Sequence, residues 1–207
     1  MCAWRVDVLL SAMLIGLIPM AVVAQPAADK PKIVVGDKWQ FNSTTEPGAK
    51  GDTWSRTVLE VPGDDRLRVQ FGGGTIGDYD GNMDWMPEGN PEYRRQLVAY
   101  PLAIGKEWSV ARRFPNPNTS ETGKAKVAAY EQITVPAGTF QCWRIEADAS
   151  LVNRTNSERR VWTRWYCPEV KWIGKEVVET TITNRNNPSG NGRTVATSEL
   201  VRFTPGN

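Results

Sequence analysis

The sequence predicts an all-β protein built around one curved antiparallel sheet. From residue 38 onward the chain is a succession of short runs rich in β-branched and aromatic residues, separated by Gly, Pro, Asn and Asp. No convincingly long stretch has the period of an amphipathic helix. Two cysteines also lie symmetrically about a polar turn, which indicates how two of the strands pair. Evenly spaced runs with turn residues between them are typical of an antiparallel sheet that is curled or closed.

The expected strands follow from these runs. In order they are residues 38–45, 54–61, 66–72, 74–79, 82–86, 93–99, 107–113, 125–135, 139–151, 158–166, 171–184 and 194–203. Residues 62–65 and 80–82 should form hairpin connections, 136–138 a tight corner, and 188–192 the last connection.

Residues 135–171 carry the strongest local signal. Folding this region about Arg154 and Thr155 sets Cys142 opposite Cys167. Directly opposed residues on antiparallel strands bring their β-carbons to about 4.5–5.5 Å, close to what a disulfide needs. We therefore expect a Cys142–Cys167 disulfide across the hairpin, with a contribution to stability of roughly 2–4 kcal/mol.

The same register separates the two faces of this hairpin. One face pairs Arg144 with Trp165 and Glu146 with Thr163, and the other pairs Trp143 with Tyr166 and Ala147 with Trp162. If the second face is the interior, Arg164 lies among its aromatic rings, either packed along them or facing a ligand. The candidate ligand-binding residues are therefore Trp143, Trp162, Arg164 and Tyr166.

The start of the chain indicates export. Residues 8–23 form an apolar run of about 16 residues, shorter than the ~20 that a membrane-spanning helix needs, and small residues precede Gln25. We expect a signal peptide over residues 1–24, a flexible arm over 25–32 and a single all-β domain over 33–207. After signal cleavage the protein should have no stable membrane span. It should lie in the periplasm or outside the cell, where disulfides persist.

Composition excludes several classes of function. The chain has no histidine, so it cannot build a Ser-His-Asp or Cys-His nucleophile, a His general base or a His-ligated metal site. Its 25 basic and 23 acidic residues give a net charge of +2, which provides no electrostatic footprint for nucleic acid. We expect a non-catalytic protein without a cofactor or a metal.

Residues 78–84 place oxygen-bearing side chains at alternate positions, as calcium loops do. An EF-hand would need glycine where Met83 stands and glutamate where Gly89 stands, so that motif is not met. A β-hairpin turn with its acidic residues on the solvent face is the favoured interpretation. A calcium site of another type is the alternative.

Three further patterns have both a structural and a functional interpretation. Trp85, Trp143, Trp162, Trp165 and Trp172 could pack in the core or stack on a ligand. Strand alternation should direct one arginine of each doublet inward or to a strand edge in Arg94-Arg95, Arg112-Arg113 and Arg159-Arg160. Such arginines could protect strand edges from aggregation, or several of them could build an anion-binding concavity. The carboxylate pairs Glu176 with Glu179 and Asp84 with Glu88 would have to converge on a cleft to act in glycoside hydrolysis.

Several motifs resemble those of an uncharacterised family of secreted bacterial β-domains. They are Val-Pro-Ala-Gly-Thr-Phe at residues 135–140, Trp-Tyr-Cys-Pro-Glu-Val at 165–170, Gly-Asp-Lys-Trp at 36–39, the segment from Tyr100 to Trp108, and Ser-Glu-Leu-Val at 198–201. The family resembles LolA/LolB-like incomplete β-barrels, which wrap a curved sheet around an apolar cavity. The resemblance implies such a fold and no catalytic residues.

These observations favour one function and leave two others open. We expect a non-catalytic domain that binds an apolar or amphipathic ligand, such as a lipid, in the concavity of its sheet. A module that binds an envelope protein along a sheet edge is one alternative. A carbohydrate-binding or carbohydrate-active protein is the other.

Overall fold

A computed structural model describes residues 27–63 and 65–207 of the chain. The expected signal peptide, residues 1–24, lies outside the described residues. The described part forms ten strands: β1 (Lys38–Glu46), β2 (Ala49–Gly63), β3 (Arg66–Phe71), β4 (Ile76–Tyr79), β5 (Glu107–Arg112), β6 (Ser120–Val135), β7 (Gly138–Val152), β8 (Asn156–Cys167), β9 (Trp172–Asn184) and β10 (Gly192–Thr204). Four single-turn 3-10 helices lie between strands: η1 (Pro87–Gly89), η2 (Pro91–Tyr93), η3 (Pro168–Val170) and η4 (Pro188–Gly190).

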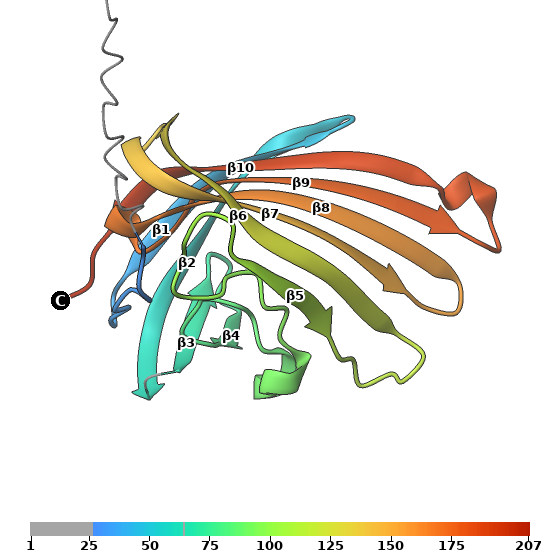
Figure 1. Ribbon diagram of the computed structural model, residues 1–207, viewed down its shortest axis with the longest axis horizontal. Coiled ribbons are helices and arrows are strands. Elements are labelled where there is room, and N and C mark those ends of the chain that lie inside the picture. The colour runs from blue at the N-terminus through green and yellow to red at the C-terminus, as the bar shows by residue number, and fades with distance from the viewer. Residues whose placement is uncertain (1–26, 64) are drawn as a thin grey trace, which may run out of the picture.

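All ten strands belong to one antiparallel sheet that does not close, as the sequence predicts. Their order is β4-β3-β2-β1-β10-β9-β8-β7-β6-β5, so the first and last strands of the chain pair at the centre. The chain runs outward from β1 to the edge strand β4 and crosses to the opposite edge as residues 80–106. It then returns strand by strand from β5 to β10. The long strands β6 to β10 arch over this crossover, which lies on the concave side between β4 and β5 (Figure 1).

The central hairpin has the predicted register. Trp143 pairs with Tyr166, Arg144 with Trp165 and Ala147 with Trp162, and the disulfide joins Cys142 to Cys167 with their Cα atoms 4.2 Å apart. A Cβ added at Gly174 would lie 2.6 Å from the Cys167 sulfur. Glycine in β9 therefore leaves the space that the disulfide occupies.

Two predicted strands, residues 82–86 and 93–99, are wrong. Both belong to the crossover, where Trp85 forms an isolated bridge with Tyr79 instead of a strand ladder and η1 and η2 begin at prolines. Met83 and Glu88 adopt left-handed backbone conformations, with φ of 64° and 56°. Prolines and left-handed residues cannot continue a strand ladder, so the short β-like runs between them stay irregular.

The prediction that the acidic residues of 78–84 face solvent is also wrong for two of them. Asp80 and Asp84 are buried, with 0% and 3% of their surface exposed. Asp80 Oδ1 accepts hydrogen bonds from the backbone N–H groups of Asn82 and Asp84, and Asp84 Oδ2 accepts one from Leu97. Among the described strands, the crossover has no neighbour whose carbonyl groups could accept these backbone hydrogen bonds. The two aspartates accept them instead, and are therefore buried.

Residues of three motifs noted in the sequence hold parts of the molecule together. Trp39 Nε1 donates a 2.7 Å hydrogen bond to the carbonyl oxygen of Val170, which joins the start of β1 to the corner between β8 and β9. Lys106 Nζ donates to the carbonyl oxygens of Ala99 and Pro101, and so fastens the crossover just before β5. The motif residues that make these contacts therefore have structural roles.

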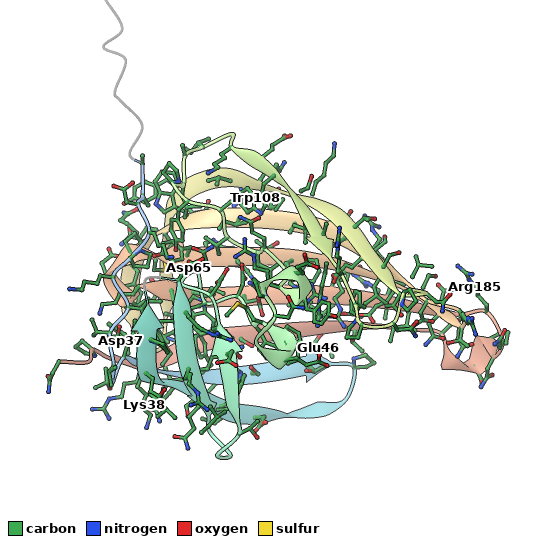
Figure 2. All side chains as sticks on the ribbon, turned by 90° about the horizontal axis from the view of Figure 1, so that it is seen from below. Asp37, Lys38, Glu46, Asp65, Trp108 and Arg185 are labelled. Carbon is green, nitrogen blue, oxygen red and sulfur yellow. A yellow bond between two sulfur atoms is a disulfide. The ribbon has the colours of Figure 1, made fainter. Side chains whose placement is uncertain are left out.

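Buried side chains form two clusters. The first surrounds Trp39 and Phe41 and includes the disulfide. The second packs Leu97, Val98 and Leu102 of the crossover against Trp143 and neighbouring residues of β5 to β8. In Figure 2 Asp37 and Arg185 mark the two ends of the sheet, and the crossover lies across the sheet between them.

An arginine-lined candidate site

A cavity of about 200 Å³ lies in the concavity beside the crossover. Its walls come from both halves of the sheet and from the crossover: Phe41, Trp54, Arg56, Tyr79, Met83, Asp84, Trp85, Arg95, Leu97, Arg112, Arg164, Trp172, Ile173, Glu176 and Ser198. The lining combines aromatic rings with four arginines, so it is not the purely apolar cavity that the resemblance to carriers implies.

Strand alternation explains why charged side chains reach this interior. On β2, Arg56 lies between Trp54 and Val58 at two-residue intervals, and all three therefore point to the same side of the strand. Val58 is fully buried, so this side is the inner one. On the paired strands β8 and β9, Arg164 lies directly opposite Glu176.

Arg56 is a half-buried cation that forms no ion pair with any carboxylate of residues 27–63 and 65–207. Its guanidinium carbon lies 4.6 Å from the ring centroid of Trp172 and 5.1–5.3 Å from those of Trp54, Phe71 and Tyr79. Its Nε is buried and has no hydrogen-bond acceptor among the described residues. Burial lowers the pKa of Arg56. The aromatic faces attract the cation but leave its N–H donors without an anion.

Arg95 and Arg164 differ from Arg56 because each has a carboxylate. Arg95 Nη2 donates a 2.8 Å hydrogen bond to Glu121, a residue with only 2% of its surface exposed. Arg164 forms an ion pair with Glu176. The charge of Arg164 is thus balanced by a carboxylate of the lining, and that of Arg95 by a carboxylate beside it.

Arg112 is the second arginine of the lining for which the described residues supply no carboxylate partner. Its Nε donates a 2.8 Å hydrogen bond to the neutral carbonyl oxygen of Tyr93. Its guanidinium lies 4.6 Å from the ring centroid of Phe114 and 5.6 Å from that of Trp85. Burial and repulsion from Arg95 lower the pKa of Arg112.

The remaining acid of the lining, Asp84, lies where burial favours the neutral form of its carboxyl group. Burial, with repulsion from the Asp80 carboxylate, raises the pKa of Asp84 to about 8. Arg94 Nη1 donates a 3.2 Å hydrogen bond to Asp80, so that carboxylate already has a cation. Asp84 therefore does little to offset the charges of Arg56 and Arg112 at neutral pH.

The structure places one of the four sequence-predicted ligand contacts in this cavity. Arg164 lines it. Trp143, Trp162 and Tyr166 are buried in the second cluster instead, where Tyr166 packs edge-on against Tyr100 and the Arg95 guanidinium lies 5.1 Å from the ring of Trp162. Burial raises the pKa values of both tyrosines.

The arginine doublets lie in different surroundings. Arg112 lines the cavity, whereas Arg113 is exposed and pairs with Glu92. Arg95 lines it as well, while Arg159 of the third doublet pairs with Asp148 on the outside. Strand alternation therefore accounts for Arg112 on β5, whereas Arg95 reaches the cavity from the crossover. Nothing in the sequence singled out Arg56, which has no arginine beside it. Its position between Trp54 and Val58 is the signal that could have found it.

The proposed carboxylate pairs do not converge. Glu176 faces the cavity, whereas Glu179, three residues further along the same strand, lies on the opposite side and pairs with Arg193. Asp84 is buried and Glu88 is exposed. Within residues 27–63 and 65–207, no three cysteine or carboxylate side chains gather as metal ligands do.

No protein-family model and no curated protein matches this chain. Among solved structures, it is similar to a proposed lipoprotein from Parabacteroides distasonis, with 15% identity and a TM-score of 0.49 over 87% of this chain and 100% of that one. It is also similar to a proposed exported protein with a YmcC-like fold from Bacteroides fragilis (15% identity, TM-score 0.44, 86% of this chain and 100% of that one). A third is the hypothetical lipoprotein YmcC from Escherichia coli (7% identity, TM-score 0.44, 83% of this chain and 86% of that one).

For the described part of the chain, none of the helices has the length and apolar character needed to cross a membrane.

Proposed function

We propose that this protein is a non-catalytic binding domain that holds an amphipathic anion in the concavity of its sheet. The observation that carries the proposal is Arg56, a half-buried cation that is surrounded by rings and has no ion-pair partner among the described residues. Desolvating a charge without a partner is costly. A bound anion would supply the missing partner, and the site is therefore more favourable with a ligand than without one.

The walls support an apolar part in the same ligand. Phe41 and Trp54 stack with centroids 4.2 Å apart, and Trp172 meets Phe41 edge-on at 5.5 Å. Since one water needs about 10–15 Å³ of such space, the cavity has room for on the order of ten waters. That is smaller than most drug-sized sites. The head of the ligand and its first carbons would fit, while a longer tail would lie outside the cavity.

The proposal includes the prediction that the protein is exported to the periplasm or the cell exterior. Anionic lipids are one source of such a ligand there. The proposal also keeps the expectation of a non-catalytic role. An envelope-protein partner and a carbohydrate ligand remain predictions that no feature of this cavity favours over an amphipathic anion.

The test compares two probes with the same tail, octyl sulfate and octanol, below their aggregation limits. Tryptophan fluorescence should report binding, because Trp54, Trp85 and Trp172 line the cavity. We expect octyl sulfate to bind at least tenfold more tightly than octanol, since a charge-assisted hydrogen bond contributes about 1.5–3 kcal/mol. Arg56→Met should remove that preference.

The matched control is Arg193→Met, which removes an arginine whose partner, Glu179, lies on the outside of the sheet. It should leave octyl sulfate binding unchanged. Equal affinity for octyl sulfate and octanol in the unaltered protein would overturn the proposal. So would an Arg56→Met variant that binds octyl sulfate as well as the unaltered protein does.

A further inference from the structure

The second unpaired cation, Arg112, gives the cavity more positive charge than one monovalent anion would neutralise. Arg56 belongs to β2 and Arg112 to the edge strand β5. These strands lie in opposite halves of the sheet order, yet both arginines line the same cavity. A ligand in the cavity therefore has one unpaired guanidinium in its wall from each half of the unclosed sheet.

The other charged groups of the site balance one another. Arg164 pairs with Glu176 inside the lining, and Arg95 pairs with Glu121 beside it. Burial raises the pKa of Asp84 to about 8 and so favours its neutral form at pH 7. Arg56 and Arg112 are then the two cations of the lining that form no ion pair within the described residues, although Glu176 and Glu121 lie near enough to act on them electrostatically.

We infer that the ligand carries a doubly charged head of the phosphate monoester type, with Arg56 and Arg112 as its two cationic contacts. This inference rests on the proposed function and assigns the chemistry of the head. A guanidinium offers a planar fork of N–H donors that matches phosphate oxygens. A tetrahedral phosphate has three terminal oxygens, and two arginines from different walls can share them. One carboxylate, by contrast, would leave one of the two positive charges without a counter-charge.

The experiment compares octyl phosphate with octyl sulfate at pH 7.5. The two probes share a tail and a tetrahedral head, but the phosphate, with its second pKa near 6, carries almost two negative charges and the sulfate only one. We expect octyl phosphate to bind at least tenfold more tightly, measured by tryptophan fluorescence and confirmed by calorimetry. Inorganic phosphate at the same concentrations should compete weakly, because it has no apolar tail.

The test variant and its matched control come from the same doublet, Arg112-Arg113. Arg112→Met should reduce the preference for octyl phosphate to less than threefold while octyl sulfate still binds. Arg113→Met, which removes the exposed neighbour paired with Glu92, should change neither affinity. Arg112→Lys, which preserves the charge, should recover part of the preference. A circular dichroism melt of each variant establishes that it is folded.

The outcomes separate this inference from the proposed function. Equal binding of the two esters, each tighter than octanol, would overturn the doubly charged head and leave the anion site intact. Octyl sulfate no better than octanol would remove the proposed function itself. Inorganic phosphate that binds as tightly as octyl phosphate would contradict the amphipathic ligand and assign the site to free phosphate.

Discussion

Two charged residues of the interior, Asp37 and Arg56, show opposite ways of placing an ion inside this protein. Asp37 is fully buried. Its two oxygens accept hydrogen bonds from the backbone N–H groups of Val34 and Gly206 at 2.9 and 2.8 Å. They also accept bonds from Lys171 Nζ at 2.9 and 3.0 Å. Arg56 has four aromatic rings around it and forms no ion pair with a carboxylate of the described residues.

The difference separates a structural charge from a charge available to a ligand. Asp37 joins the segment before β1, the segment after β10 and the corner before β9, and the protein itself satisfies it completely. The part of the chain that the structure describes leaves the buried Nε of Arg56 without an acceptor. If this interpretation is correct, removing Asp37 should damage the fold, whereas removing Arg56 should damage binding.

The largest effect on stability is therefore expected for Asp37→Ala. The substitution leaves Lys171, whose side chain is 25% exposed, without its carboxylate, and it leaves two backbone N–H groups without acceptors. Breaking a buried pair by removing one partner typically costs about 3–5 kcal/mol. Urea unfolding followed by circular dichroism should show a loss of this size.

The control is Asp148→Ala, which breaks the exposed pair with Arg159 on the outer face. Exposed pairs contribute about 0–1 kcal/mol, so this variant should unfold almost as the unaltered protein does. If Asp37→Ala costs no more than Asp148→Ala, the hydrogen bonds around Asp37 do not hold the molecule together as we describe.

Much of the fold could be predicted because it depends on local patterns. The alternation of apolar and polar residues and the position of the turn between them fix the register of β7 and β8. The two cysteines, which lie at equal distances from that turn, confirm it. The crossover, residues 80–106, could not be predicted in the same way. Its β-like runs are short, and their partners are side chains such as Asp80 and Asp84 rather than neighbouring strands.

The candidate site could be predicted only in part, because it depends on which distant residues meet. The sequence shows that Arg112 or Arg113 points inward, and that Arg164 lies among aromatic residues. It does not show that Glu176 neutralises Arg164 while Arg56 stays unpaired. That distinction requires the arrangement of β2, β8 and β9 around one cavity.

An intermediate effect, dependent on pH, is expected for Asp84→Asn. Burial raises the pKa of Asp84 to about 8, whereas an unfolded aspartate has a pKa near 3.9. Between these values the folded state holds a proton that the unfolded state has lost, so stability is highest below about pH 4 and falls as pH rises toward 8. The slope from this group approaches ~1.4 kcal/mol per pH unit. Asparagine does not titrate and should abolish this contribution.

Urea unfolding of both proteins at pH 5, 6, 7 and 8 measures this contribution. The free energy of unfolding of Asp84→Asn, relative to that of the unaltered protein, should increase steadily with pH. The amide oxygen of the substituted side chain would still accept the hydrogen bond that the Leu97 N–H donates to Asp84, so the local structure should persist. A difference that stays constant across the four pH values would show that Asp84 is ionised in the fold.

The smallest effect on stability, and the sharpest contrast with Asp37, is expected for Arg56→Met. Methionine is similarly long and unbranched and packs well against aromatic rings. The substitution removes the cation–π attraction of the guanidinium, about 0.5–2 kcal/mol. This loss is offset because the variant has no desolvated charge at this position and leaves no carboxylate partner unpaired. We expect the free energy of unfolding to change by less than about 1 kcal/mol, measured by urea unfolding without ligand beside Asp37→Ala. A loss as large as that of Asp37→Ala would mean that the aromatic rings around Arg56 serve to stabilise the fold, and the unpaired cation would then no longer point to a ligand.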